Sequence, residues 1–377
     1  MIDLHGVTWD HERGWGGLRA AVDAYTELRP DVRITWETRS LQAFADRPVE
    51  EVDGYDLIVL DHPSIGAAVG RGSIVALDEH LDPAILEDQR AASVGRSFAS
   101  YTWDGHQWAL AVDAAAQVAA YRKDLLDRAG VDVPRTWDDV LRAASALGER
   151  GLRIAMPAIP VDAVCAFLGI SAAPFDGGQV VEREAGRRAL AILREVIEVA
   201  HPISLTSNPP SVLAHMAELE DVAYCPLAFG YVTFAHDGLA PHRLRFAPGP
   251  ASSGTLGGAG IAVSSGSANV TAACAFVAFV TSPDVQRGVY VASGGQPGHR
   301  AAWTDPDVDA ASNGFFSETL SALDAAYLRP RHDGFLAFQD EAGGILHPYL
   351  RDGGDPDDVL DRVDAAYRAS RVTEVER

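Results

Sequence analysis

The chain has 377 residues, of which 47% are hydrophobic and 22% charged, an ordinary composition for a soluble globular protein with enough length for two domains. Its 31 basic residues stand against 53 acidic ones, which gives a formal net charge of −22. A field of that sign repels phosphate backbones and anionic lipids, so we expect no nucleic-acid partner and no membrane insertion. Cys165, Cys225 and Cys274 form no CxxC pair and lie in apolar stretches, which predicts buried thiols and no disulfide framework.

The N-terminal residues bear on the compartment. Met1 leads into IDLHGVTWDH with no basic patch and no apolar h-region. The longest apolar runs fall far short of the ~20 residues that span a bilayer. We expect a cytoplasmic protein if the chain is the complete gene product, and a periplasmic or extracellular one if a leader has been removed.

The first part of the chain alternates between strand and helix patterns. The expected elements are a strand over Ile2–Val7, a polar loop over Thr8–Gly16, a helix over Leu18–Leu28, a strand over Val32–Glu37, a helix around Leu41–Val52 and a strand over Tyr55–Leu60. The last of these is almost continuously apolar, as in strands that are buried on both faces of a parallel sheet. This alternation predicts a doubly wound α/β lobe.

The pattern then changes to a hairpin and a second set of helices. Asp104-Gly105 indicates a hairpin turn, and QWALAVDAA and QVAAYR read as two short strands. Thr136 is the expected N-cap of a helix that Gly151 ends. An amphipathic helix follows in REAGRRALAILREVIEVA, then a crossing strand in a Pro-, Gly- and Ser-rich stretch, and the C-terminal third is helical.

Four segments, in their order along the chain, carry a resemblance to a known family. The first has a strand that ends in a tyrosine, then a short helix, a proline and a helix start, at Tyr121, Pro134, Thr136, Trp137 and Asp138. The others are DVAYCPLAFGYVTFA, LGGAGIAVSSGSANVTAACAFVAFVTSPDVQ and GGQPGHRAAW. Together they resemble family 1 extracellular solute-binding proteins, the maltose-binding-like class of ABC importers.

This resemblance implies a fold and a function. The expected fold is α/β and periplasmic-binding-protein-like of type II, with two doubly wound lobes joined by a hinge and built from discontinuous segments. The lobes are expected at residues 1–108 plus 258–302 and at 109–257 plus 303–377. The protein would bind a small polar solute in the cleft between the lobes, as a monomer without a cofactor, and ABC transporter membrane subunits would be its partners.

Two loops of the first lobe are the expected ligand contacts. Ligands of open α/β sheets bind beyond the carboxyl ends of the strands, where these loops begin. The loop after the first strand offers Trp9, Asp10, His11 and Arg13, and the loop after Tyr55–Leu60 offers Asp61 and His62. The alternative for both loops is that the polar residues cap the following helices. A metal at the two Asp-His pairs is not expected, because adjacent residues of an extended chain point in opposite directions and no HExxH spacing is present.

Other expected ligand contacts lie later in the chain. They are Asp113 and Tyr121, the aromatic residues Tyr224 and Tyr231, Gly258 with its accessible backbone amide, and Arg329. The alternative is core packing for the tyrosines and a surface position for the arginine.

The ligand and the activity stay open at this point. A sugar or a small carboxylic acid would suit these side chains. The absence of a nucleophile elbow favours a binding protein over an enzyme. Two alternatives remain: an enzyme on the same scaffold that uses His11 or His62, and an intracellular sensor of a metabolite.

Overall fold

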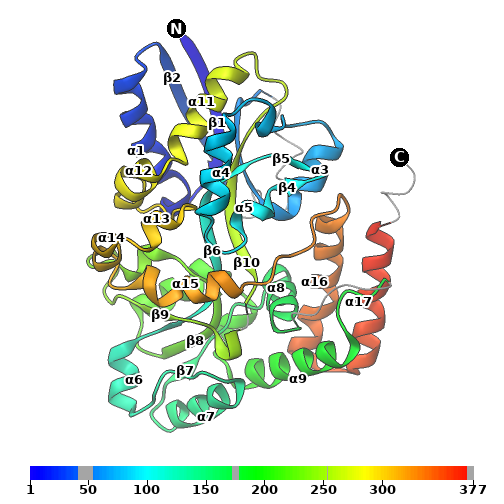
Figure 1. The fold of residues 1–377 in the computed structure, drawn as a ribbon. Helices are drawn as coiled ribbons and strands as arrows, with labels where there is room; N and C mark the ends of the chain where they lie inside the picture. Colours follow the sequence, from blue (N-terminus) through cyan, green and yellow to red (C-terminus); the bar gives the residue numbers. More distant parts are fainter. Residues whose placement is uncertain (41–53, 172–177, 253, 372–377) are drawn as a thin grey trace. The chain divides into compact units, whose positions relative to one another are not determined.

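The computed structural model describes residues 1–40, 54–171, 178–252 and 254–371 (Figure 1). The helix expected around Leu41–Val52 lies outside the described residues. The chain divides into two compact units, which are described separately below. Unit 1 comprises Met1–Ala115, Gly257–Leu320 and Pro330–Asp333, and unit 2 comprises Ala116–Leu256, Ser321–Arg329 and Gly334–Arg377. The lobe boundaries expected from the resemblance stay a prediction.

Unit 1 is built on a mixed sheet with the strand order β2-β1-β3-β10. β1 runs parallel to β2 and β3, and β10 runs antiparallel to β3. The strands span β1 Ile2–Trp9, β2 Val32–Arg39, β3 Leu57–Asp61 and β10 Leu256–Val263. The order of strand, helix and parallel strand at the start of the chain matches the doubly wound pattern that the sequence predicts.

The helices of unit 1 close its core. α1 contacts α11, and the rings of Tyr25 and Phe276 from these two helices meet edge to face at 5.3 Å. The helices span α1 Glu12–Leu28, α3 Ile65–Gly70, α4 Pro83–Ala91, α5 Ser97–Ser100, α11 Val270–Val280, α12 Pro283–Val285, α13 Arg300–Trp303, α14 Pro306–Ala311 and α15 Phe315–Ala325, the last of which continues into unit 2. Short 3-10 helices span η1 His62–Ser64 and η2 Leu77–Glu79, and the π-helix η6 spans Gln286–Tyr290.

The loop after β1 is much shorter than the expected Thr8–Gly16. The strand continues to Trp9 and the helix already begins at Glu12, so only Asp10 and His11 separate them. His11 makes this early start possible because its Nδ1 accepts a hydrogen bond from the Arg13 amide, as an N-cap side chain does. Glu12 adds a negative charge to the first turn, which the helix dipole favours.

A hairpin leads into the long strand β6. Asp104 and Gly105 both have positive φ, of 49° and 81°, between β4 (Thr102–Trp103) and β5 (His106–Gln107), which confirms the expected turn. The expectation of two short strands after it was wrong, because β6 is one strand over Leu110–Tyr121. The segment between the two expected strands is alanine, with no glycine or proline that would break the strand. β6 passes from unit 1 into unit 2 after Ala115.

The sheet of unit 2 is formed by β6, β8, β7 and β9. β8 (Val222–Phe229) runs antiparallel to β6 and parallel to β7 (Arg153–Ile154). β9 (Arg245–Ala247) pairs with β6 on its other side, also antiparallel. All residues of β8 except Phe229 are buried, as its apolar sequence suggests.

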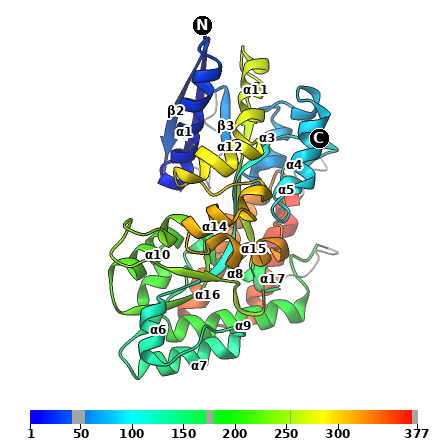
Figure 2. The same ribbon diagram turned by 60° about the vertical axis from the view of Figure 1, so that its left-hand side comes forward.

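Helices distant in sequence complete unit 2. α16 packs against α8 and α17, and α8 and α17 also pack against α9, so the C-terminal helices share one core with the middle of the chain (Figure 2). The helices span α6 Lys123–Ala129, α7 Trp137–Gly148, α8 Pro160–Ser171, α9 Arg183–Val199, α10 Pro209–Glu218, α16 Phe335–Asp352 and α17 Pro356–Arg371, and the 3-10 helices η3 Pro202–Leu205, η4 Val232–Ala235 and η5 Pro250–Ser252. Thr136 forms the expected N-cap of α7 within a full capping box with Asp139.

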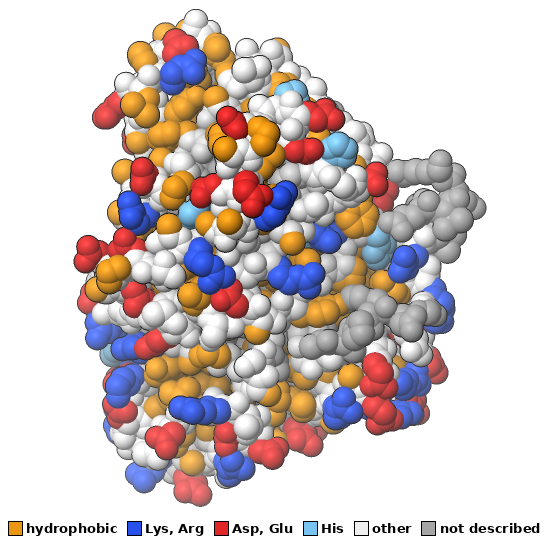
Figure 3. All heavy atoms as spheres, viewed as in Figure 1, with side chains coloured by type: hydrophobic (Ala, Val, Ile, Leu, Met, Phe, Trp, Pro, Cys, Tyr) orange, Lys and Arg blue, Asp and Glu red, His pale blue; other side chains and the backbone are white. Residues whose placement is uncertain are grey.

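The distribution of charged side chains and the apolar character of the helices are the features that would indicate nucleic-acid or membrane partners. On the face shown in Figure 3, basic and acidic side chains are interspersed, and the basic ones do not gather into a single patch. Within the ranges that the structure describes, no helix has both the length and the apolar character needed to cross a membrane.

Candidate functional site

The carboxyl ends of β1 and β3 bring the two expected loops together in unit 1. The strands are parallel neighbours, with Gly6 opposite Leu57 and Val7 opposite Ile58. Asp10 and His11 follow the end of one strand, and Asp61 and His62 stand at the end of the other. The structure therefore places both Asp-His pairs at the same sheet edge, which is where ligands bind in open α/β sheets.

A buried ion pair joins this edge to β6. In Arg13, Nε donates to Asp113 Oδ1 at 2.8 Å and Nη2 donates to Oδ2 at 2.5 Å. The two side chains are only 5% and 1% exposed. Burial raises the pKa of Asp113, the Arg13 guanidinium opposes this, and the charge of Asp61 adds to the rise. Asp61 therefore lies close enough to this pair to add to its electrostatics.

His11 is held as a neutral ring beside this cluster. Burial and, to a smaller extent, the Arg13 charge together lower its pKa to about 4, against the partly opposing effect of Asp10. A neutral imidazole has a free lone pair on one nitrogen, which here accepts the Arg13 amide at 3.1 Å. His11 thereby fixes the first turn of α1, from which Arg13 reaches Asp113.

Trp9 and His62 are more deeply buried than we expect of side chains that contact a ligand from a loop. Trp9 is 3% exposed and belongs to the core cluster of unit 1, where its ring covers Gly14 so closely that a side chain there would clash. His62 is fully buried with its ring edge against Tyr101, and its Nδ1 lies 3.1 Å from Asp61 Oδ1. Their roles as ligand contacts stay predictions, and Asp10, which is exposed, stays the more accessible candidate.

Gly258 lies in β10 next to the backbone of Asp113. Its φ is +96°, and a Cβ atom at this position would lie 2.4 Å from the Asp113 carbonyl oxygen. Only glycine satisfies both conditions. Gly258 thus allows the close approach that positions Asp113, and contact of its amide with a ligand stays a prediction.

Four expected residues lie in unit 2. Tyr121 ends β6 opposite Tyr224 of β8, and Tyr224 is fully buried. Tyr231 precedes η4, is 5% exposed and faces Phe234 with ring centroids 6.5 Å apart. Arg329 is 3% exposed and donates to Gln339 Oε1 at 3.1 Å, so it is not a surface residue. Their contact with a ligand stays a prediction.

Sequence reasoning missed one acidic residue in unit 2. Asp162 lies in the first turn of α8, is 4% exposed, and its Oδ2 has no hydrogen-bond partner among the described residues. Burial raises the pKa of Asp162 to about 7, although the Arg329 charge lowers it. A lone aspartate within the apolar run PVDAVCAFLG was the available signal.

The donor groups around the two Asp-His pairs bear on the question of a metal. In the part of the chain that the structure describes, the two pairs belong to no group of three or more His, Cys, Asp or Glu donors close enough to hold an ion. The carboxylates and the guanidinium at this edge are groups that form charge-assisted hydrogen bonds.

Comparisons with known proteins agree with this architecture. A probable amino-acid ABC transporter periplasmic-binding protein, y4oP, of Sinorhizobium fredii is 28% identical over 202 residues, covering 50% of this chain and 46% of that protein, so the match spans less than half of its length. UgpB from Mycobacterium tuberculosis in complex with glycerophosphocholine has a TM-score of 0.82 at 17% identity, with all of both chains covered. Maltose-bound MalE3 of T. maritima has a TM-score of 0.80 at 19% identity, over 98% of this chain and 100% of the other.

These structural similarities confirm the expected fold class, a mixed α/β fold of the type II periplasmic-binding-protein kind. The family described as bacterial extracellular solute-binding protein matches residues 16–287, which is more than half of the chain and includes Asp61, Asp113 and Gly258. The resemblance inferred from the four sequence segments is thereby confirmed, and the chain belongs to the bacterial extracellular solute-binding protein family.

Proposed function

We propose that the protein is the substrate-binding component of an ABC importer and that it binds a small polar solute outside the cytoplasm. The match to the solute-binding family over residues 16–287 carries this proposal. The sheet edge of unit 1, with Asp10, Asp61 and the Arg13–Asp113 pair, would form one wall of the ligand site. This position agrees with the rule that ligands of α/β sheets bind beyond the strand ends.

The charges at this edge favour a neutral polyhydroxy solute over a carboxylic acid. Asp10, Asp61 and Asp113 bring three carboxylates to this edge, and the Arg13 guanidinium pairs with that of Asp113. Carboxylates accept hydrogen bonds from hydroxyl groups and repel an anionic ligand. The maltose bound to MalE3 fits this class, and the glycerophosphocholine bound to UgpB shows a polar solute that also carries a phosphodiester.

Calorimetric titration of the ligand-free protein with maltose, ribitol, glycerophosphocholine and glutamate tests the proposal. We expect saturable binding of one neutral polyol or sugar per chain. Asp10→Ala and Asp61→Ala should each weaken it about tenfold or more, which corresponds to the loss of a charge-assisted hydrogen bond. Asp284→Ala is the control, because this carboxylate of unit 1 is exposed and pairs with Arg287 in the same surface turn.

Thermal unfolding of each variant separates a binding effect from a folding effect, and the unfolding temperatures should stay within a few degrees of wild type. Tight binding of glutamate with no response to the neutral solutes would overturn the assignment of ligand class. Wild-type affinity in both aspartate variants would remove this edge from the ligand site.

A further inference from the structure

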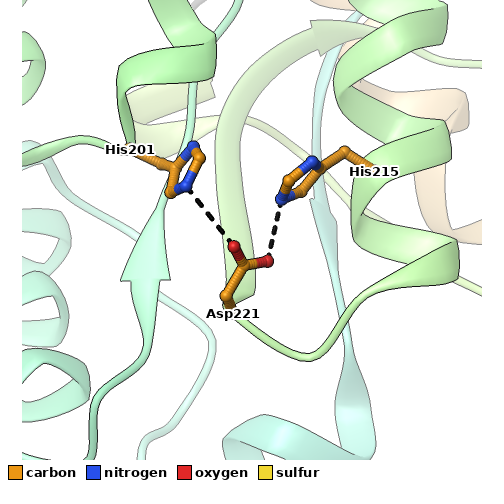
Figure 4. Close-up of side chains that lie close together, drawn as sticks. All are labelled: His201, His215 and Asp221. Carbon is orange, nitrogen blue, oxygen red and sulfur yellow. Dashed lines mark hydrogen bonds and ion pairs between the residues drawn. The ribbon is translucent and has the colours of Figure 1, made fainter.

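Two histidines and an aspartate converge in unit 2. His201 stands directly before η3, His215 lies in the last turns of α10, and Asp221 directly precedes β8. Figure 4 shows both rings turned toward the carboxylate. His215 Nε2 lies 2.8 Å from Asp221 Oδ1, and His201 Nε2 lies 3.4 Å from Oδ2. One donor atom from each side chain falls within 4.8 Å of the other two.

The backbone holds this arrangement in place. The amide of His201 donates to the carbonyl of Ile154 at 2.7 Å, and the amide of Arg153 donates to the carbonyl of Asp221 at 2.7 Å. Strand β7 therefore fixes two of the three donors through adjacent residues. His215 is fixed separately, by the helix α10 that packs against β8. Because the three side chains are already close together, the free-energy cost of ordering them when an ion binds is small.

The donor set is chemically selective. Two imidazoles and one carboxylate suit Zn²⁺ and other late first-row divalent ions, whereas Ca²⁺ and Mg²⁺ require oxygen ligands. The side chains are 24%, 16% and 44% exposed, so an ion has access and water can supply the fourth ligand.

We propose that His201, His215 and Asp221 form a binding site for a zinc ion on unit 2. In a tetrahedral site with bonds of about 2.0–2.1 Å the ligand atoms lie about 3.3 Å apart. The two histidines face different oxygens of Asp221, at 3.4 and 2.8 Å, and one donor atom from each of the three side chains lies within 4.8 Å of the others. Side-chain rotations that move these atoms by about an ångström would bring them to the tetrahedral spacing.

One contact sets the expected strength of the site. His201 Nδ1 accepts the amide of Ile203 at 3.2 Å, which requires a lone pair on this nitrogen. A metal on Nε2 moves the ring proton to Nδ1, so this hydrogen bond is lost when the ion binds. We therefore expect micromolar affinity, well below that of closed structural zinc sites.

The experiment is a titration of the chelator-treated, full-length protein with ZnCl2, followed by calorimetry, and with CoCl2, followed by visible absorption. We expect one Zn²⁺ per chain and, for Co²⁺, the intense absorption bands of a tetrahedral complex. His215→Ala and Asp221→Asn should each weaken Zn²⁺ binding at least tenfold and abolish the tetrahedral bands.

His106→Ala is the matched control and should keep wild-type affinity. His106 forms a similar pair with Asp78, at 2.9 Å on unit 1, but this pair is not part of a three-donor group among the described residues. Circular dichroism of each variant confirms that it is folded. No binding by the wild type, equal binding by wild type and the two ligand variants, or octahedral cobalt bands would each overturn the proposal.

Discussion

The buried pair of Arg13 and Asp113 should be strongly coupled in the stability of unit 1. Replacing Arg13 with methionine leaves the Asp113 carboxylate in a site that is 1% exposed, without its bidentate partner. Removing one member of such a pair costs about 3–5 kcal/mol, because an uncompensated charge stays buried. Asp113→Leu leaves the guanidinium in the same position and should cost a similar amount.

The double variant is the informative one. If the two losses were independent they would add to about 6–10 kcal/mol, but the double variant buries no charge and should lose no more than about 3 kcal/mol. The coupling energy should therefore be at least about 3 kcal/mol. Arg29 and Asp31 provide the control, because they form the same two-bond geometry at 3.0 and 2.9 Å on an exposed surface, where we expect no measurable coupling.

Denaturant unfolding followed by tryptophan fluorescence measures this effect mainly in unit 1. Six of the seven tryptophans lie in that unit and only Trp137 lies in unit 2, the six being Trp9, Trp15, Trp36, Trp103, Trp108 and Trp303. Additive losses in the double variant, or single losses below about 1 kcal/mol, would refute the reasoning that the pair is a desolvated ion pair.

Two further predictions concern the elements around this site. The unfolded chain takes up a proton on His11 near pH 6.5 and the folded chain only near pH 4, so stability is complete above pH 6.5 and falls as the pH drops toward 4. A pKa of about 4 in place of 6.5 sets an upper limit of about 3.4 kcal/mol on the lost stability, and partial exposure of His11 reduces the expected loss to about 2 kcal/mol. His11→Asn keeps an N-cap side chain without the titration, so an unchanged acid dependence of its unfolding would contradict the prediction. Gly66→Ala should destabilise unit 1 by more than about 1 kcal/mol, because the new Cβ would lie 2.1 Å from the Arg331 carbonyl oxygen. Gly344→Ala is the control, because this helical position has open space around it and alanine favours the helix, so the variant should be slightly more stable. Thermal unfolding measures both effects.

Much of the fold was predictable because it depends on local signals. The N-cap at Thr136 and the hairpin turn at Asp104-Gly105 depend on residues close together in sequence, and the structure has both at the expected positions. The prediction of two strands in place of β6 was wrong because no local signal shows where this strand ends. The chain continues through alanines, which neither break nor extend a strand by themselves. The early start of α1 depended on His11, which is an unusual N-cap residue.

The candidate site was predictable in position but not in contacts. Ligands of open α/β sheets bind beyond the carboxyl ends of the strands, and the order of strands and helices alone is enough to place Asp61 and Arg13 at that edge of the sheet. The partner of Arg13 lies 100 residues away in sequence, and no pattern in a single sequence marks such a pair. Burial of His62 likewise depends on the packing of Tyr101 against it, a contact between distant parts of unit 1.

The shared core of α8, α9, α16 and α17 has a consequence for synthesis on the ribosome. Phe338, Leu346 and Val363 pack in the same cluster as Val140 and Phe167, which are translated roughly two hundred residues earlier. A nascent chain therefore exposes the faces of α8 and α9 that α16 and α17 cover until almost its last helix has left the exit tunnel. Slow translation near the 3′ end of the message should prolong the association of the chain with trigger factor or a similar chaperone, and a stop codon before α16 should yield an aggregating product rather than a shortened folded one.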